Sequence, residues 1–148
     1  FQAEFWIRFG VAVLAGGLIG VERQVRGKPV GVRTSILICL GTAIFVGLGV
    51  GMGGDQADPT RVLGQVVTGV GFLGAGVILA RGGVVTGVTT AAVIWMLAAI
   101  GSLIGLALYS GALVLALLTV ALLAGVTLLE SVFNRLRTGA YANDDESS

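Results

Sequence analysis

The sequence is poor in charge and contains no histidine. Asp, Glu, Lys and Arg make up 11% of its 148 residues, while 55% are hydrophobic and the mean hydropathy is +0.98. A soluble domain carries about twice that charged fraction. Glycine is the opposite anomaly, with 25 residues, and small residues of this kind let transmembrane helices approach one another closely. We therefore interpret the chain as an integral membrane protein in contact with a lipid bilayer.

These absences also exclude most kinds of catalysis. Without histidine no Ser–His pair can form, and no two carboxylates lie within the apolar segments to act as an aspartyl pair. The single cysteine, Cys39, lies in an apolar run, so we expect a buried side chain and no disulfide. The net charge is +1 and basic residues are few, which disfavours nucleic acid as a partner. We expect a protein that is not an enzyme and holds no cofactor, while metal binding stays open.

Charged residues mark the boundaries of the membrane spans, because each costs roughly 2.5–3.5 kcal/mol at a bilayer centre. A span needs about 20 apolar residues. The uncharged runs therefore predict an all-α bundle of five transmembrane helices, at residues 3–22, 34–53, 60–80, 90–108 and 112–133. No β pattern competes with them. The domain covers residues 1–137, and we expect the short polar tail at 138–148 to be disordered.

Local signals refine the helix ends. Asp58 and Pro59 are typical of an N-cap followed by the first helical position, and Thr89 is expected to cap the fourth helix in the same manner. We place the break before the fifth helix at Tyr109-Ser110-Gly111, a small-residue turn beside an interfacial aromatic. Because Arg8 lies inside the first span, we expect its side chain to snorkel outward.

Basic residues predict the orientation of the bundle, because they favour the cytoplasmic side of a membrane. Only Arg8 and Arg61 fall on one side of the predicted bundle. The other side holds seven basic residues, namely Arg23, Arg26, Lys28, Arg33, Arg81, Arg135 and Arg137. We therefore expect the N-terminus outside and the C-terminus in the cytoplasm.

Glycines in the third predicted span match the G-x-G-x-x-G spacing of a dinucleotide-binding turn. No strand precedes them and they lie in mid-span, which argues against that function. We interpret them as a face for close helix packing. The residues of this face are Gly69, Gly71, Gly74 and Gly76.

The main polar cluster lies between the first two spans. Glu22 and Arg26 are four positions apart, the favourable order for an ion pair on one helix. Arg33 begins the next helix at the same depth, so we expect it to come close to Glu22, and we expect Glu22→Ala or Arg33→Ala to impair function while the protein still inserts. The alternative is that these charges face lipid headgroups and water. The candidate set at this edge is Glu22, Arg23, Arg26, Arg33 and Thr34.

Asp58, Gln65 and Thr68 form a second candidate set. Gln65 and Thr68 lie one helical turn apart in the third span, where polar groups need partners inside the bundle. Two interpretations stay open: an interhelical hydrogen bond, or a substrate route that begins at Asp58.

Several blocks of the sequence resemble the MgtC/SapB family of bacterial membrane proteins. They follow the family's order over residues 8–130. The blocks are GLIGVER at 17–23, RGKPVGVRT at 26–34, Asp58-Pro59 with Arg61 and Gln65, GVGFLGAG at 69–76, RGG at 81–83, GVTTAA at 87–92 with Trp95, and AAIG at 98–101.

The resemblance implies a five-helix protein of the bacterial inner membrane, linked to magnesium limitation, acid adaptation and survival inside host phagocytes. It also implies a regulator of other membrane machines, such as ATP synthase or transporters. Some members carry a soluble cytoplasmic domain after the fifth helix, which these 148 residues do not include.

Two functions from different classes therefore stay open. The first is a non-enzymatic regulator whose glycine-rich bundle binds a partner membrane protein or a second copy of itself, and we expect a homodimer. The second is an oligomeric transporter or channel for magnesium or another small solute, with Asp58, Gln65 and Thr68 along its route. A carrier of a strongly hydrated cation needs carboxylates near mid-membrane, whereas the acidic residues here lie at the edges of the spans. We favour the regulator.

Overall fold

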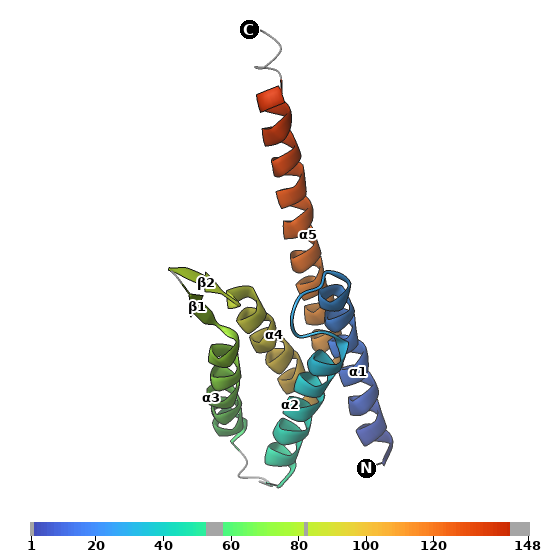
Figure 1. The fold of residues 1–148 in the computed structure, drawn as a ribbon. Coiled ribbons are helices and arrows are strands. Elements are labelled where there is room, and N and C mark those ends of the chain that lie inside the picture. The colour runs from blue at the N-terminus through green and yellow to red at the C-terminus, as the bar shows by residue number, and fades with distance from the viewer. Residues whose placement is uncertain (1, 53–57, 82, 143–148) are drawn as a thin grey trace.

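The computed structural model describes residues 2–52, 58–81 and 83–142 (Figure 1). Within them the chain forms α1 (Gln2–Val25), α2 (Val32–Met52), α3 (Pro59–Val77), β1 (Leu79–Arg81), β2 (Val84–Thr86), α4 (Val88–Gly105) and α5 (Tyr109–Ala142). Five of the described helices contain a stretch long and apolar enough to cross a membrane. The predicted all-α membrane fold with five transmembrane helices is confirmed.

The connections between helices collect at two ends of the bundle (Figure 1). The loop at residues 26–31 and the β1–β2 hairpin lie at one end, which we name the hairpin end. The start of α1, the end of α2 and the start of α3 lie at the opposite end, which we name the N-terminal end. Helix α5 extends beyond the other helices at the hairpin end and continues to Ala142. Residues 143–148 fall outside the described residues, so disorder of the tail stays a prediction.

Helix α2 packs closely on two neighbours because both approach it through glycine. On α1, a Cβ at Gly20 would overlap Val32 Cα, and one at Gly16 would lie 2.9 Å from the backbone of α2. On α4, a Cβ at Gly101 would lie 2.6 Å from a backbone carbonyl oxygen of α2, and one at Gly105 would lie 2.9 Å from another. Backbone atoms cannot move aside as a side chain can. These small residues therefore set the distance from α2 to both neighbours.

The interior of the bundle is filled with apolar side chains from α1, α2, α4 and α5. Cys39 is fully buried there, and its Sγ donates to the Leu97 carbonyl at 3.3 Å, as expected of a small buried side chain. A smaller cluster attaches α3 to α4. The main core consists of Ala12, Ala15, Ile19, Cys39, Ala43, Val93, Leu97, Ile100, Ile104, Ala112 and Ala116, and the smaller cluster of Val70, Ile94 and Ala98.

The β1–β2 hairpin contradicts our expectation that no β structure forms. The strands are antiparallel, with Leu79 opposite Thr86. The hairpin ends α3 at Val77, before its predicted end, and Gly87 then begins α4 with a left-handed φ of 89°. A Cβ at Gly87 would overlap the Val77 carbonyl oxygen, so only glycine fits there. Thr89 is not the cap of α4, because the N-cap position falls on Gly87, which makes no side-chain hydrogen bond.

The turn between α4 and α5 also differs from the prediction. It lies at residues 106–108 rather than at Tyr109-Ser110-Gly111, which already belong to α5. The Leu108 N–H donates to the Leu103 carbonyl at 2.8 Å, and Ala107 adopts a left-handed φ of 61°. This pattern is the Schellman motif, whose left-handed position glycine normally occupies. Because alanine stands there, the sequence gives no signal for the turn.

Within a single chain, only one of the four glycines of the predicted packing face of α3 lies against a neighbouring helix. A Cβ at Gly74 would touch Trp95 of α4 at 3.6 Å, so this glycine does face a neighbouring helix. A Cβ at Gly69, Gly71 or Gly76 would meet nothing within 4 Å. Only 11% of the apolar window of α3 is buried, against 56% for α4. Helix α3 therefore leaves most of its surface, including these glycines, outside the bundle.

Candidate functional site

Arg23 is the central residue of the polar cluster at the hairpin end. Helix α1 continues past its predicted end, so Arg23 lies in its last turn, where a cation is favourable for the helix dipole. Arg23 is only 4% exposed. The Nε–H donates to the Pro29 carbonyl at 3.1 Å, and Nη2 donates to Thr90 Oγ1 at 2.8 Å. One guanidinium thus connects α1, the loop at 26–31 and the first turn of α4.

The loop that Arg23 holds is strained. Gly27 ends α1 with a φ of 63°, in the same hydrogen-bond pattern as at Ala107. Val30 also adopts a left-handed φ, of 62°, which for a β-branched residue costs on the order of 1–3 kcal/mol. Its carbonyl accepts from Ser35 Oγ at 3.1 Å, and its side chain packs on both apolar clusters. The surrounding contacts therefore fix an otherwise unfavourable backbone conformation.

Glu22 pairs with Arg26, as the sequence predicts. Arg26 Nε lies 2.5 Å from Glu22 Oε1, and the Glu22 side chain is only 9% exposed. Its second oxygen, Oε2, is buried and has no hydrogen-bond partner among the described residues. A carboxylate that is buried on one side and paired on the other is poorly solvated, so removing Arg26 would leave an uncompensated charge.

Arg33 does not join this pair. It and Thr34 are exposed, and Arg33 makes no ion pair within the described part of the chain. The reason lies in the start of α2, where Val32 lies against Gly20 and Ser35 is fully buried. At 100° per residue, the two positions between them turn away from α1. The ion pair expected between Arg33 and Glu22 is therefore not formed among the described residues.

The second candidate set lies along α3 and does not come together into one site. Asp58 caps α3, as predicted, and accepts from the Thr60 N–H at 2.9 Å and from its hydroxyl at 2.6 Å. These hydrogen bonds, with the nearby Arg61, lower the pKa of Asp58. Thr68 donates to the Gly64 carbonyl of its own helix at 3.0 Å, and Gln65 is exposed. The interhelical hydrogen bond, the first of the two interpretations, is therefore not formed among the described residues of one chain.

A second polar cluster, which the sequence analysis missed, lies at the N-terminal end. Arg8 forms an ion pair with Glu4, which lies one turn nearer the start of α1, with Nη2 2.6 Å from Oε1. Its Nη1 lies over Gly47 of α2, at a place where a Cβ would collide with it. The Arg8 Nε and the Tyr109 hydroxyl are both buried without a hydrogen-bond partner among the described residues. The helical spacing of Glu4 and Arg8 was the available signal for the pair.

The sequence also contained a signal for the burial of Arg23. Ala12, Ala15 and Ile19 of α1 are fully buried. Position 23 is the next on that face, four residues after Ile19. The periodicity of α1 therefore indicates that Arg23 faces the bundle, unlike the other arginines of the loop.

Comparisons with known proteins identify relatives of this chain by sequence. The family model for the MgtC family matches residues 9–132. The chain is 50% identical over 114 residues to YhiD of Escherichia coli (strain K12), a protein named as a candidate magnesium transporter, with 72% of this chain and 53% of that protein covered. It is 45% identical over 132 residues to protein MgtC of Brucella abortus (strain 2308), with coverages of 88% and 55%.

Protein MgtC of Salmonella paratyphi A is 41% identical over 133 residues, with 88% of this chain and 56% of that protein covered. The chain thus spans about half the length of the curated relatives it matches. No solved structure matches it. The names of these three relatives state no catalytic activity. The match of the family model over most of the chain, with these identities, shows that the chain belongs to the MgtC family.

Proposed function

We propose that this chain is the transmembrane module of a non-enzymatic regulator in the bacterial inner membrane, which acts on a partner membrane protein when magnesium is limiting. The link to magnesium rests on the name of its relative YhiD, and the link to regulation on the MgtC family resemblance. The hairpin end is the cytoplasmic end in this proposal, since it carries most of the basic residues.

The observation that carries the proposal is the apolar core. Small and branched apolar side chains from four helices fill the middle of the bundle. The acidic residues of the described helices and caps lie at the edges of the spans: Glu4, Glu22 and Asp58 at helix ends, and Glu130 directly after the span Tyr109–Leu129 of α5. A hydrated divalent cation exchanges its waters for oxygen ligands, and an apolar core offers it none. This arrangement disfavours a cation route through one copy of the chain.

A regulator needs surfaces that change or dock, and the described helices offer two. Arg23 couples the strained loop at 26–31 to α4, so a contact made on the loop is transmitted to α4. The exposed face of α3 carries glycines with open space above them, which lets another transmembrane helix approach.

A second copy of the chain is one such neighbour, and the proposal includes a homodimer. Crosslinking or native mass spectrometry in mild detergent tests it, and a strictly monomeric species over a wide concentration range contradicts it.

A magnesium flux assay separates the regulator from a carrier. The purified chain in liposomes that hold a magnesium-sensitive dye should give no influx above protein-free liposomes. The same chain should support growth of a deletion strain at low magnesium. Influx at channel-like rates would overturn the regulator.

A Lys28→Cys variant tests the orientation, because a membrane-impermeant maleimide should label it only from the cytoplasmic side.

An oligomeric transporter is the second candidate, and the exposure of Gln65 is the observation that favours it. Gln65 and Thr68 face outward at membrane depth, so an assembly of several copies would bring these residues together around a shared route. The name of YhiD supports the same view. Gln65→Leu tests this route, and Gln65→Asn, which keeps the amide, is its control. If growth of the complemented strain at low magnesium is as good with Gln65→Leu as with Gln65→Asn and the wild type, this route is wrong.

A further inference from the structure

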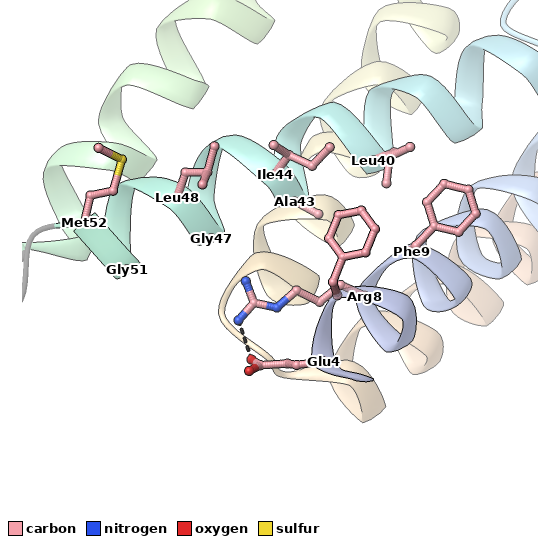
Figure 2. A pocket seen from close by; sticks show the side chains of 11 residues that line it. Glu4, Arg8, Phe9, Leu40, Ala43, Ile44, Gly47, Leu48, Gly51 and Met52 are labelled. Carbon is pink, nitrogen blue, oxygen red and sulfur yellow. Dashed lines mark hydrogen bonds and ion pairs between the residues drawn. The ribbon is translucent and has the colours of Figure 1, made fainter. Parts of the chain in front are cut away.

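At the N-terminal end of the bundle, the first part of α1 and the second half of α2 do not close on each other completely. Helix α1 and the second half of α2 enclose a groove of about 470 Å³ (Figure 2). Its walls are apolar along most of their length. The main apolar wall residues are Phe5, Phe9, Leu40, Ile44, Leu48 and Met52. In a chain with five membrane-spanning helices, such a groove opens toward lipid rather than toward water.

The groove has one polar end. Glu4 and Arg8 belong to its lining and form the ion pair seen in Figure 2. The Glu4 side chain is 55% exposed and that of Arg8 29% exposed, so both charges are reachable from the groove. Gly47 makes room for the Arg8 guanidinium, which therefore turns toward α2 instead of away from the bundle.

The apolar part extends from this polar end toward the middle of the span. On α2 the lining runs from Met52, the last residue of the helix, to Leu40 near its centre. Twelve residues at 1.5 Å each correspond to about 18 Å. Glu4 lies in the first turn of α1, at the same end as Met52. The groove therefore has its charges at the depth of lipid headgroups and its apolar walls at the depth of acyl chains.

We infer that this groove binds a phospholipid with a zwitterionic headgroup that carries a primary ammonium. One acyl chain lies between α1 and α2, the phosphate pairs with Arg8 and the ammonium pairs with Glu4. A guanidinium binds phosphate through charge-assisted hydrogen bonds, and a carboxylate accepts them from an ammonium. An anionic headgroup without an ammonium meets Glu4 as a like charge, so the ion pair selects against it. The site holds whether or not the chain acts as a regulator.

Lipid titration of the purified protein followed by native mass spectrometry tests the inference. Phosphatidylethanolamine and phosphatidylglycerol with the same acyl chains are the two probes. The wild type should bind phosphatidylethanolamine about tenfold more tightly, the effect of one charge-assisted contact. Glu4→Gln should remove most of this preference. Equal binding of both lipids by the wild type would overturn the headgroup assignment and with it the inference.

Two glycines of α2 give a matched pair of variants. A Cβ at Gly51 or at Gly41 would meet nothing within 4 Å, but only Gly51 lines the groove. Gly51→Leu should fill the groove and weaken phosphatidylethanolamine binding about tenfold, while Gly41→Leu should bind like the wild type. Unchanged binding by Gly51→Leu contradicts the site. If Gly51→Leu instead separates a dimer and leaves lipid binding unchanged, a second copy occupies the groove and the inference is wrong.

Discussion

Thr90→Val tests whether Arg23 connects the loop at 26–31 to α4 in the way the structure shows. Valine keeps the shape of threonine but removes the hydroxyl that accepts from Arg23 Nη2 at 2.8 Å. Both residues are buried, at 4% and 5% exposure, so water cannot replace the lost acceptor. The guanidinium then keeps its bond to Pro29 and loses the one to α4.

The expected cost follows from that burial. A hydrogen bond to a charged group contributes about 1.5–3 kcal/mol. A buried charged donor that loses its acceptor costs at least as much free energy as a buried neutral donor that loses its own. We expect Thr90→Val to lower the free energy of unfolding by about 2 kcal/mol. A double-mutant cycle with Arg23→Met should show a coupling of similar size, since residues in one network are not additive.

Thr89→Val is the matched control, because Thr89 is exposed and is the neighbouring residue in the same turn. Surface substitutions of this kind stay within about 0.5 kcal/mol. Reversible unfolding in mixed micelles gives both values under the same conditions. If the two valine variants unfold at the same denaturant concentration, or if the cycle shows no coupling, Arg23 does not hold α4 through Thr90.

Three further predictions concern the ends and contacts of the helices. Ala107→Gly should raise the free energy of unfolding by about 1 kcal/mol, because glycine adopts the left-handed φ without strain; an unchanged value contradicts this. Gly101→Ala should cost about 1–3 kcal/mol, since its Cβ would meet a carbonyl oxygen of α2, whereas Gly41→Ala should be neutral or stabilising. The folded-state pKa of Asp58 is lowered, so its contribution to stability is present above the unfolded pKa and is lost as the pH falls through the folded one. Asp58→Asn keeps an N-cap that does not titrate. On acidification the wild type should therefore lose free energy of unfolding relative to Asp58→Asn.

The sequence predicts the five spans well because charge is expensive in a bilayer and therefore marks their ends. The Asp58 cap and the Glu22–Arg26 pair were predictable for a similar reason, since each depends on residues close together in one element. The elements that were missed depend on backbone conformation instead. Ala107 holds a left-handed turn that usually requires glycine, and the hairpin pairs two strands of three residues each, which are too short for a β pattern to stand out in the sequence.

Contacts between helices were the least predictable feature. The glycines of α1, α3 and α4 look alike in the sequence, yet those of α1 and α4 pack on α2 while most of those of α3 face outward. Whether a glycine packs depends on whether the fold places another helix beside it. The spacing of small residues in the sequence does not say which helices become neighbours. The same holds for Arg33, whose distance from Glu22 depends on the rotation of α2 about its axis.

The burial of Arg23 is not explained by stability alone. Replacing a buried charged network with apolar side chains of similar volume is often neutral or stabilising, and the desolvation of a guanidinium is costly. What an apolar residue cannot do is bind a loop carbonyl and a hydroxyl of another helix in fixed directions, as Arg23 does with Pro29 and Thr90. The loop in turn holds Val30 in a strained conformation next to both apolar clusters. Arg23 therefore specifies the position of the hairpin-end loop relative to α4, which is the property that a docking surface at this end requires.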